Sequence, residues 1–343
     1  MSVDSKNQYD ALLLVSFGGP EGMNEVIPFL ENVLRGRNVP RERMVQVAHH
    51  YEIFNGVSPI NQQNRELINA LKKELETEGP NLPIYWGNRN WNPLLKDTVQ
   101  QMVDDGIKHA LAFVTSAYSS YSSCRQYLQN IADAQTAVGP SAPQIEKLRA
   151  FYNHPLFIEA NAEHIRALMV GPFENASSVR LVFTAHSVPE SMAGNSDYVV
   201  QLHEAGRLIA NHVGFENWQL VYQSRSGSPQ QPWLGPDICD YLKQISAEGV
   251  SHVIVAPIGF VSDHMEVIYD LDVEANQLAS DLGLTMLRTA TAGTNPKFIE
   301  MIRELILEKT QNAPARFSGS HGIRLSPCSP GCCLPPVSGS TQN

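Results

Sequence analysis

Residues 252–282 read HVIVAPIGFVSDHMEVIYDLDVEANQLASDL, and they join an apolar run to a longer helical pattern through a short polar stretch. The run, residues 252–258, is rich in β-branched residues and has the length of a buried strand. From residue 266 to 282 apolar residues recur at three- and four-residue spacing, which predicts a helix. A strand that leads into a helix is the repeating unit of parallel sheets.

The same unit recurs along the whole chain. Apolar runs predict further strands at residues 11–16, 82–86, 109–115, 179–184, 218–223 and 284–287. Helical patterns occupy residues 22–34, 59–78, 92–106, 124–138, 155–169, 198–213, 237–248 and 296–309. This alternation predicts an α/β fold with two doubly wound, Rossmann-like parallel-sheet domains that are approximate repeats of each other.

The series divides near AFYNHPLFIEAN, residues 150–161, into two sets of similar size. We expect an N-terminal domain at 1–152, a C-terminal domain at 153–312 and a tail at 313–343. The tail is rich in Gly, Pro and Ser and has no helical period. It is expected to be loop or disorder unless contacts tie it down.

Composition limits the function. A chain of 343 residues with 43% hydrophobic content can bury a sizeable core. The net charge of -10, without clustered Lys and Arg, argues against nucleic-acid binding and favours a small-molecule partner. The amino terminus lacks the pattern of a signal peptide, and the first apolar run is too short to be a transmembrane segment. We expect a cytoplasmic protein.

Polar stretches follow most of the predicted strands. They read SFGGP, TSAYSSYSS, TAHSVP, QSRSG and PIGFVSDH. Open parallel sheets bind ligands beyond the carboxyl ends of their strands, so these stretches are expected to line a cleft between the domains. The glycines of SFGGPEG do not have the spacing of a nucleotide-binding loop.

The predicted helix at 266–282 carries a row of acids. Glu266, Asp270 and Glu274 stand four residues apart, so they lie near one face of the helix. An ordinary solvated face, with acids at the positive helix start, is one interpretation. Like charges at this spacing repel, however, and apolar residues flank the row. This favours an enclosed path for divalent cations or protons.

His186 stands two residues after the apolar run at 179–184, at the carboxyl end of another predicted strand. A lone histidine is more often a structural residue than a functional one. Its position at a strand end favours a role in the site. His186 and Glu266 would then form two halves of a metal-handling centre.

Three of the five cysteines, Cys328, Cys332 and Cys333, stand within six residues of the tail. Disulfides are unexpected in a cytosolic chain, so the cluster indicates a metal or redox site. An iron–sulfur cluster of the [2Fe-2S] type needs a fourth thiolate, from Cys124 or Cys239. Cys239 fits a buried helix position, the usual place of a free cysteine. Zinc, or a tail without any ligand, are the alternatives.

Several motifs together resemble the ferrochelatases. They are SFGGP, GVSPIN, YSSYSSCRQY, TAHSVP, QSRSG with PWLGP, and PIGFVSDHMEVIYDLD, in the order and approximate spacing of that family. The resemblance extends from residue 9 to about residue 309 and looks strongest to the actinobacterial branch, coproporphyrin III ferrochelatases with a cysteine tail. It implies a class II chelatase fold and a lyase of haem biosynthesis. The reaction would insert Fe²⁺ into coproporphyrin III and give coproheme.

The resemblance also implies residue roles. His186 and Glu266 would bind Fe²⁺ and accept the pyrrole protons, with Asp270 and Glu274 as the path. The family's motifs mark Ser58 and Tyr127 for the porphyrin, and Phe17 of the first loop is a further expected contact. Arg35, in the loop after the first predicted helix, is expected to offer a positive charge to the propionates of coproporphyrin. A solvated basic loop is an alternative for Arg35. Relatives from other Gram-positive bacteria carry a Tyr at the position of Phe17, where it can ligate the product iron. Phe17 has no side-chain oxygen, so it cannot take that role.

Resemblance favours Cys124 as the fourth ligand of a [2Fe-2S] cluster with Cys328, Cys332 and Cys333, because some ferrochelatases draw a ligand from this region. Transient contact with neighbouring haem-pathway enzymes is expected. The alternatives are a protoporphyrin IX ferrochelatase, a chelatase for a cobalt or nickel tetrapyrrole, and a non-enzymatic tetrapyrrole- or iron-binding redox sensor.

Overall fold

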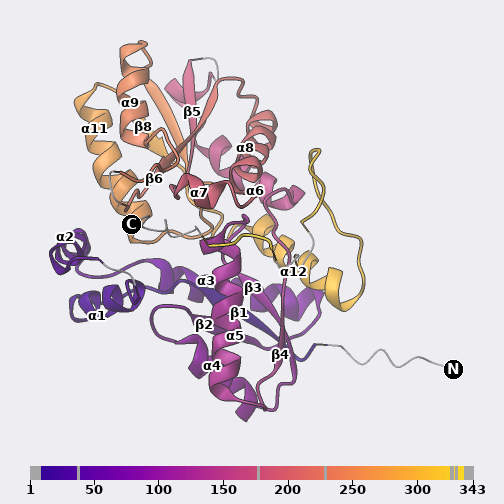
Figure 1. The fold of residues 1–343 in the computed structure, drawn as a ribbon. Coiled ribbons are helices and arrows are strands. Elements are labelled where there is room, and N and C mark those ends of the chain that lie inside the picture. The colour runs from indigo at the N-terminus through magenta and orange to yellow at the C-terminus, as the bar shows by residue number, and fades with distance from the viewer. Residues whose placement is uncertain are drawn as a thin grey trace.

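The structure, a computed structural model, describes residues 9–36, 39–175, 178–227, 230–324, 328 and 331–335, and it contains two parallel sheets flanked by helices (Figure 1). The first sheet has the order β2-β1-β3-β4. Its strands are β1 (Ala11–Ser16), β2 (Ile84–Asn88), β3 (His109–Val114) and β4 (Gln144–Lys147). Its helices are α1 (Met23–Val33), α2 (Arg41–Glu52), α3 (Ile60–Glu78), α4 (Leu95–Asp104), the π-helix η1 (Tyr121–Arg125) and α5 (Gln126–Val138).

The second sheet has the order β6-β5-β7-β8. Its strands are β5 (Val179–His186), β6 (Trp218–Gln223), β7 (His252–Ala256) and β8 (Thr285–Arg288). The helices of this half are α6 (Pro155–Leu168), η2 (Gly171–Phe173), α7 (Glu190–Ala193), α8 (Tyr198–Val213), α9 (Ile238–Ala247), α10 (Met265–Val267), the π-helix η3 (Ile268–Ala275), α11 (Asn276–Asp281) and α12 (Pro296–Thr310).

The two sheets are built in the same way. In each, the first strand pairs with the second and the third, and the fourth pairs with the third, all in parallel. Residues of β1 alternate between two cores, with Leu12 and Leu14 on one face and Leu13 and Val15 on the other. Burial on both faces explains the continuous apolar runs. The predicted α/β fold with two repeated doubly wound sheets is confirmed.

One hydrophobic core runs from the first sheet into the second half. Phe113 of β3 stacks on Phe151, with ring centroids 5.3 Å apart, and Phe298 of α12 lies 5.9 Å from Phe151. Helix α12 packs against both α3 and α6. The halves are therefore joined by shared core residues, and the boundaries 1–152 and 153–312 stay a prediction.

Four elements lie where the sequence analysis expected none, namely α2, β4, η2 and α7. Strand β4 is a short edge strand whose residues, QIEK, show no apolar run. Helix α2 was expected as loop, and it buries only Met44 and Tyr51. In addition, the single helix expected at 266–282 is divided into α10, η3 and α11. These segments are shaped by contacts with other elements more than by their own periodicity.

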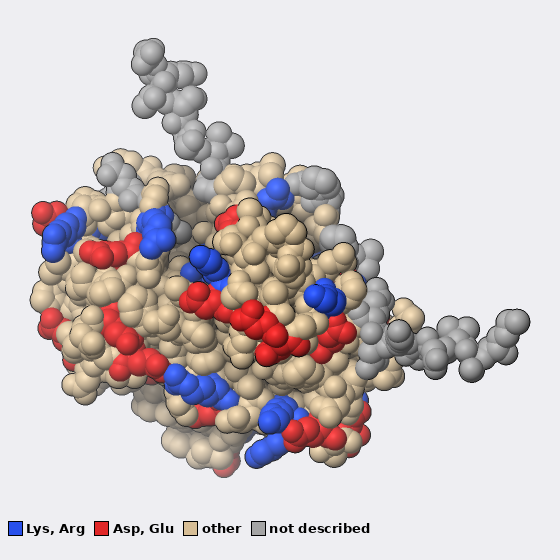
Figure 2. All heavy atoms as spheres, turned by 90° about the horizontal axis from the view of Figure 1, so that it is seen from below, with Lys and Arg blue, Asp and Glu red and all other residues tan. Residues whose placement is uncertain are grey.

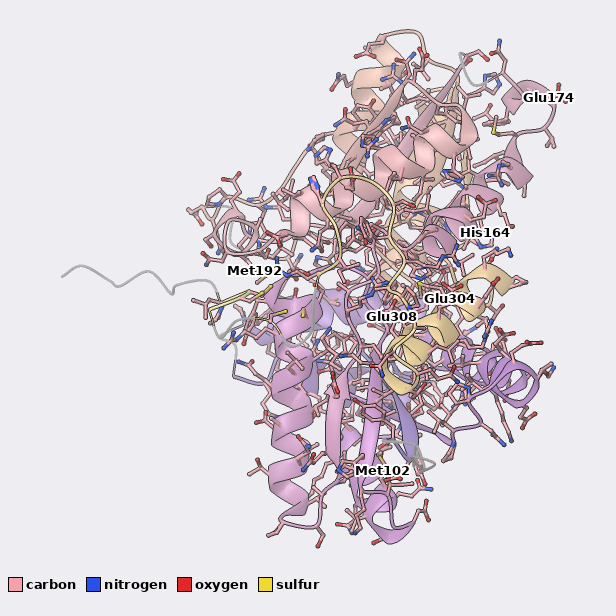
Figure 3. All side chains as sticks on the ribbon, turned by 90° about the vertical axis from the view of Figure 1, so that its right-hand side faces the viewer. Met102, His164, Glu174, Met192, Glu304 and Glu308 are labelled. Atoms are coloured by element: carbon pink, nitrogen blue, oxygen red, sulfur yellow. The ribbon has the colours of Figure 1, made fainter. Side chains whose placement is uncertain are left out.

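Hydrogen bonds tie the described part of the tail to both halves. The Ser318 amide donates to the Asn153 carbonyl over 2.8 Å, and the Asn153 amide donates to the Gly322 carbonyl over 2.7 Å. Arg149, from the first half, donates to the Arg316 carbonyl of the tail over 2.9 Å. Figure 3 shows Glu304 and Glu308 on α12, beside the tail. The tail up to residue 324 is thus docked loop, and parts of its remainder lie outside the described residues.

The surface carries charges of both signs. Figure 2, a view from below the first half, shows Asp and Glu side chains interspersed with Lys and Arg over the described residues of that face. Such mixing does not offer the continuous basic surface that phosphate backbones bind. Across the described ranges, every helix is too short or too polar to traverse a bilayer.

Candidate active site

His186 is the last residue of β5, a central strand of the second sheet. Its Nδ1 lies 2.5 Å from the Ser187 carbonyl oxygen. A carbonyl oxygen only accepts hydrogen bonds, so Nδ1 carries the proton and Nε2 is left for chemistry. The Tyr198 hydroxyl donates to the His186 carbonyl over 3.0 Å, which holds the backbone of this strand end.

Glu266 is the second residue of α10, the short helix that comes after the loop following the neighbouring strand β7. Its Oε2 lies 3.3 Å from His186 Nε2, and about half of the Glu266 side chain is exposed. Burial lowers the pKa of His186, but the charge and hydrogen bond of Glu266 outweigh burial and raise the pKa above its usual value. The structure therefore brings the two predicted residues together as an imidazole–carboxylate pair.

The acid row continues from this pair through η3. Its i→i+5 hydrogen bonds make wider turns, a feature that often occurs at functional sites. Asp270 Oδ2 accepts a 2.5 Å hydrogen bond from the Ser224 hydroxyl, and the Gln223 amide approaches the same oxygen at 3.4 Å. Burial raises the pKa of Asp270 to about 7, with Glu266 and Glu274 adding to the rise. The three acids thus interact, as the row predicted.

Glu274 lies at the far end of the row. Burial raises its pKa, and the nearby Asp237 raises it further. Cys239 lies beside the same acids, and burial followed by Asp237 and Glu274 raises the pKa of its thiol to about 12. The described interactions of Cys239 are therefore with the acid row, Asp237 and Lys243.

Phe17 and Tyr127, two predicted porphyrin contacts, lie around a common cation. The guanidinium carbon of Arg89 is 4.5 Å from the centroid of the Tyr127 ring and 5.6 Å from that of Phe17. Arg89 also donates to the Asn130 side chain over 2.7 Å, which fixes its position. Sequence analysis missed Arg89, although it follows β2, and the strand-end rule applied to GNRN would have found it.

Ser58 is 4% exposed and packs against the GGP loop. Its amide donates to the Pro20 carbonyl over 2.9 Å. A Cβ atom at Gly19 would lie only 2.7 Å from the Ser58 Cβ, and Gly18 has φ +80°. Close packing of two loops thus explains these glycines.

Arg35 lies just beyond the end of α1 and is exposed. Its Nη2 donates to the Asn32 side chain over 2.5 Å. Asn32 donates in turn to the Asn90 carbonyl over 3.2 Å. Arg35 is therefore held at the outer rim of the first half, in the segment between α1 and α2.

Helices α1 and α2 cover α10 and η3. Met265 is buried in a hydrophobic cluster with Phe29 and Tyr51. His50 of α2 stacks on Tyr269 of η3, with ring centroids 3.8 Å apart and an interplanar angle of 4°. Burial raises the pKa of Tyr51, and the Glu266 charge adds to the rise. The first half therefore closes one side of the candidate site.

The three tail cysteines meet Cys124 of η1. Hydrogen bonding to Cys328 lowers the pKa of the Cys124 thiol to about 7, although burial opposes the shift. Cys328 also contacts Cys332, and the sulfurs of Cys332 and Cys333 lie 3.3 Å apart. Arg125 donates to the Cys332 carbonyl over 2.8 Å. Four thiols are thus linked by contacts, and their role as cluster ligands stays a prediction.

A preformed metal geometry is a stricter condition than contact. Within the ranges that the structure describes, no three His, Cys, Asp or Glu side chains are already arranged to hold a metal ion. The thiols would need to adjust their positions around a bound group. Short side chains on a Gly- and Pro-rich segment allow such an adjustment.

Comparison with known proteins agrees with this geometry. The ferrochelatase family profile matches residues 9–310. A ferrochelatase of Rhodopirellula baltica is 52% identical, covering 96% of each chain. The coproporphyrin III ferrochelatase of Streptomyces coelicolor is 49% identical over 95% of this chain and 93% of its own. That of Nocardia farcinica is also 49% identical, over 95% and 97%.

Among solved structures, SirB from Bacillus subtilis with Fe3+ matches with a TM-score of 0.57 and 11% identity, covering 88% of this chain and 96% of its own. At this identity the match shows the fold alone, which is that of the class II chelatases. The family match extends over most of the chain and includes the segments that carry His186 and Glu266. The chain therefore belongs to the ferrochelatase family.

Proposed function

We propose that the protein inserts Fe²⁺ into coproporphyrin III and forms coproheme, with His186 and Glu266 at the reacting centre. The pair at 3.3 Å is the observation that carries this proposal. The porphyrin assignment is supported by the names of the relatives from Streptomyces coelicolor and Nocardia farcinica.

The reaction needs a group that strips water from Fe²⁺ and takes up two pyrrole protons. The hydrogen bond from Nδ1 to Ser187 keeps a proton on Nδ1, so the neutral form of His186 has its lone pair on Nε2 and can bind iron or accept a proton there. Glu266 adds a carboxylate, which binds divalent cations and accepts protons. His186 comes from the end of β5, and Glu266 comes from α10, beyond the loop that follows the neighbouring strand β7.

Protons and iron then need a route through the protein, and the acid row supplies one. Asp270 has a pKa of about 7, so it exchanges protons near neutral pH. Gln223 donates to the Glu266 carbonyl over 3.2 Å and approaches Asp270 as well, which links the start of the row to its middle. We assign Glu274 to the outer end of this path.

The macrocycle is assigned to the side of the site formed by Phe17 and Tyr127. Arg89, held between their rings, supplies a positive charge for a propionate. Arg35 at the rim and Ser58 under the GGP loop are the further porphyrin contacts that we propose. Ser58 requires a shift of that loop, because its side chain is buried. Phe17 has no oxygen, so it does not ligate the product iron.

We propose Cys124, Cys328, Cys332 and Cys333 as ligands of a [2Fe-2S] cluster. Their mutual contacts fit a group that takes four thiolates. When bound, such a cluster would accept one electron and cross-link the tail to η1. A cytoplasmic location and transient contact with neighbouring haem-pathway enzymes are further predictions.

The test is anaerobic incubation with Fe²⁺ and coproporphyrin III, followed by porphyrin fluorescence. Wild-type protein should quench the fluorescence, and His186→Ala should not. His252→Ala is the matched control, since His252 stands at the opposite end of the neighbouring strand. Equal inertness of wild type and His186→Ala would favour a non-enzymatic redox sensor. Faster turnover of protoporphyrin IX would reassign the substrate.

Metal and sulfide analysis of the same preparation tests the cluster. Two irons and two sulfides per chain, with visible absorption that bleaches on reduction, are expected for the [2Fe-2S] type. A colourless protein with one zinc per chain would assign the four thiols to zinc instead.

A further inference from the structure

Arg324 stands between the cysteine tail and the second half of the protein. Its Nη2 donates to the Cys332 sulfur over 2.8 Å. Its Nη1 forms an ion pair with Asp197, the residue directly before α8. No signal in the sequence pointed to Arg324, because both partners are identified only by the fold. Arg324 is also hydrogen-bonded to the Cys328 side chain, so its positive charge lies directly beside two of the four thiols.

We propose that Arg324 tunes the reduction potential of the [2Fe-2S] cluster, with Asp197 acting against it. The inference rests on the cluster proposed above. It assigns Arg324 a positioning and electrostatic role toward the cluster, in addition to docking the tail.

The reason is electrostatic. Reduction by one electron adds a negative charge that spreads over the cluster and its thiolates. A guanidinium that donates to a ligand sulfur stabilises the reduced state more than the oxidised state, so it raises the potential. Asp197 carries the opposite charge on the far side of the guanidinium, so it partly cancels this effect.

The surroundings of the pair favour a clean test. Arg324 and Asp197 border a hollow of about 300 Å³, together with Tyr152 and Gln201. Their side chains are 32% and 46% exposed. Arg324 is hydrogen-bonded to both Cys332 and Cys328, so its substitution changes the charge beside two of the four thiols.

The experiment is a reductive titration with dithionite, followed by visible absorption. Arg324→Gln should lower the midpoint potential, and Arg324→Lys should give an intermediate value. Asp197→Asn should raise it, because the amide oxygen still accepts from Arg324 while its charge is gone. Arg316→Gln is the control, since Arg316 binds Glu304 at 2.5 Å in the same tail without touching a cysteine. Its potential should equal that of wild type.

Shifts of opposite sign separate this role from a structural one. If Arg324→Gln loses its cluster, Asp197→Asn still decides, because a raised potential supports the inference and an unchanged or lowered one overturns it. Unchanged potential in a fully loaded Arg324→Gln protein also overturns it. A wild-type tail without iron and sulfide overturns both this inference and the cluster, while iron insertion by His186 and Glu266 is measured separately.

Discussion

The π-helices η1 and η3 occupy corresponding places in the two halves, since each follows the third strand of its sheet. Segment η1 presents a thiol, Cys124, to the cysteine tail. Segment η3 presents Asp270 and Glu274 in line with Glu266. A π-turn inserts a residue into a helix and turns the following side chains. The two halves therefore carry different chemical groups at corresponding positions, a thiol in η1 and carboxylates in η3.

The two segments are also held in different ways. The Ser120 hydroxyl caps η1 by accepting from the Ser123 amide over 3.1 Å. No side chain caps η3. Instead Arg288 of β8 binds Asp272 with two hydrogen bonds, of 2.5 and 2.8 Å. A local cap thus holds the thiol segment, whereas a contact with the sheet holds the acid segment. This suits a row that must stay in register with His186.

The largest effect should come from the start of the acid row. Glu266→Gln removes the carboxylate beside His186 Nε2 and is expected to lower kcat for iron insertion by about 10²–10⁴-fold. Glu274→Gln, at the outer end of the row, should lower kcat by a smaller factor. Stopped-flow fluorescence with coproporphyrin III measures both. Wild-type kcat in Glu266→Gln would remove η3 and its row from the chemistry.

The counterpart in η1 is Cys124→Ser, which should abolish nearly all bound iron and sulfide. A serine hydroxyl replaces the thiolate poorly, because soft sulfur ligands hold iron–sulfur clusters. Cys239→Ser is the matched control and should keep the colour of wild type, since the described neighbours of Cys239 are Asp237, Lys243 and the acid row, not the tail cysteines. Iron analysis and visible spectra give the answer. If Cys239→Ser loses the colour and Cys124→Ser keeps it, the fourth ligand is Cys239 and not Cys124.

Asp270 supplies a stability test of the acid row. Its pKa is about 7 in the folded protein, against about 4 in an unfolded chain. The folded state binds this proton more tightly, so its contribution to stability is complete below about pH 4 and is lost as pH rises through 7. Asp270→Asn should therefore raise the free energy of unfolding at pH 8, by on the order of 2 kcal/mol, with little change at pH 4.

Urea denaturation at the two pH values measures this difference. In wild type, the rate of iron insertion should rise near pH 7 as Asp270 ionises. Asp270→Asn should lack this rise. If wild type and Asp270→Asn have equal free energies of unfolding at pH 8, the Asp270 carboxylate is solvated, as on an ordinary exposed helix face.

Much of this fold was predictable because the strands are buried on both faces. The runs at 11–16 and 218–223 coincide with β1 and β6. The π-helices were not predictable, since residues four apart lie on one side in either type of helix. Their hydrogen-bond register depends on distant partners, such as Arg288 for Asp272 and Ser224 for Asp270.

The site divides in the same way. His186, Glu266 and the cysteines are marked by position and by motif, and the structure brings each set together. Arg89 and Arg324 carry no motif, because their roles come from rings and sulfurs supplied by other segments. A cation that acts through such contacts is visible only once the chain is folded.

The smallest expected effect concerns the cap of η1. Ser120→Ala leaves the Ser123 amide without its acceptor and should lower the free energy of unfolding by about 1 kcal/mol. Ser122→Ala is the control, because its hydroxyl makes only a 3.2 Å contact with Ser120 and a 3.9 Å contact with the Met192 sulfur. Denaturation and iron insertion should be measured on both. If Ser120→Ala is less stable but inserts iron at the wild-type rate, the role of η1 is limited to positioning Cys124. Slower insertion in Ser120→Ala would show that the thiol segment also shapes the reacting centre.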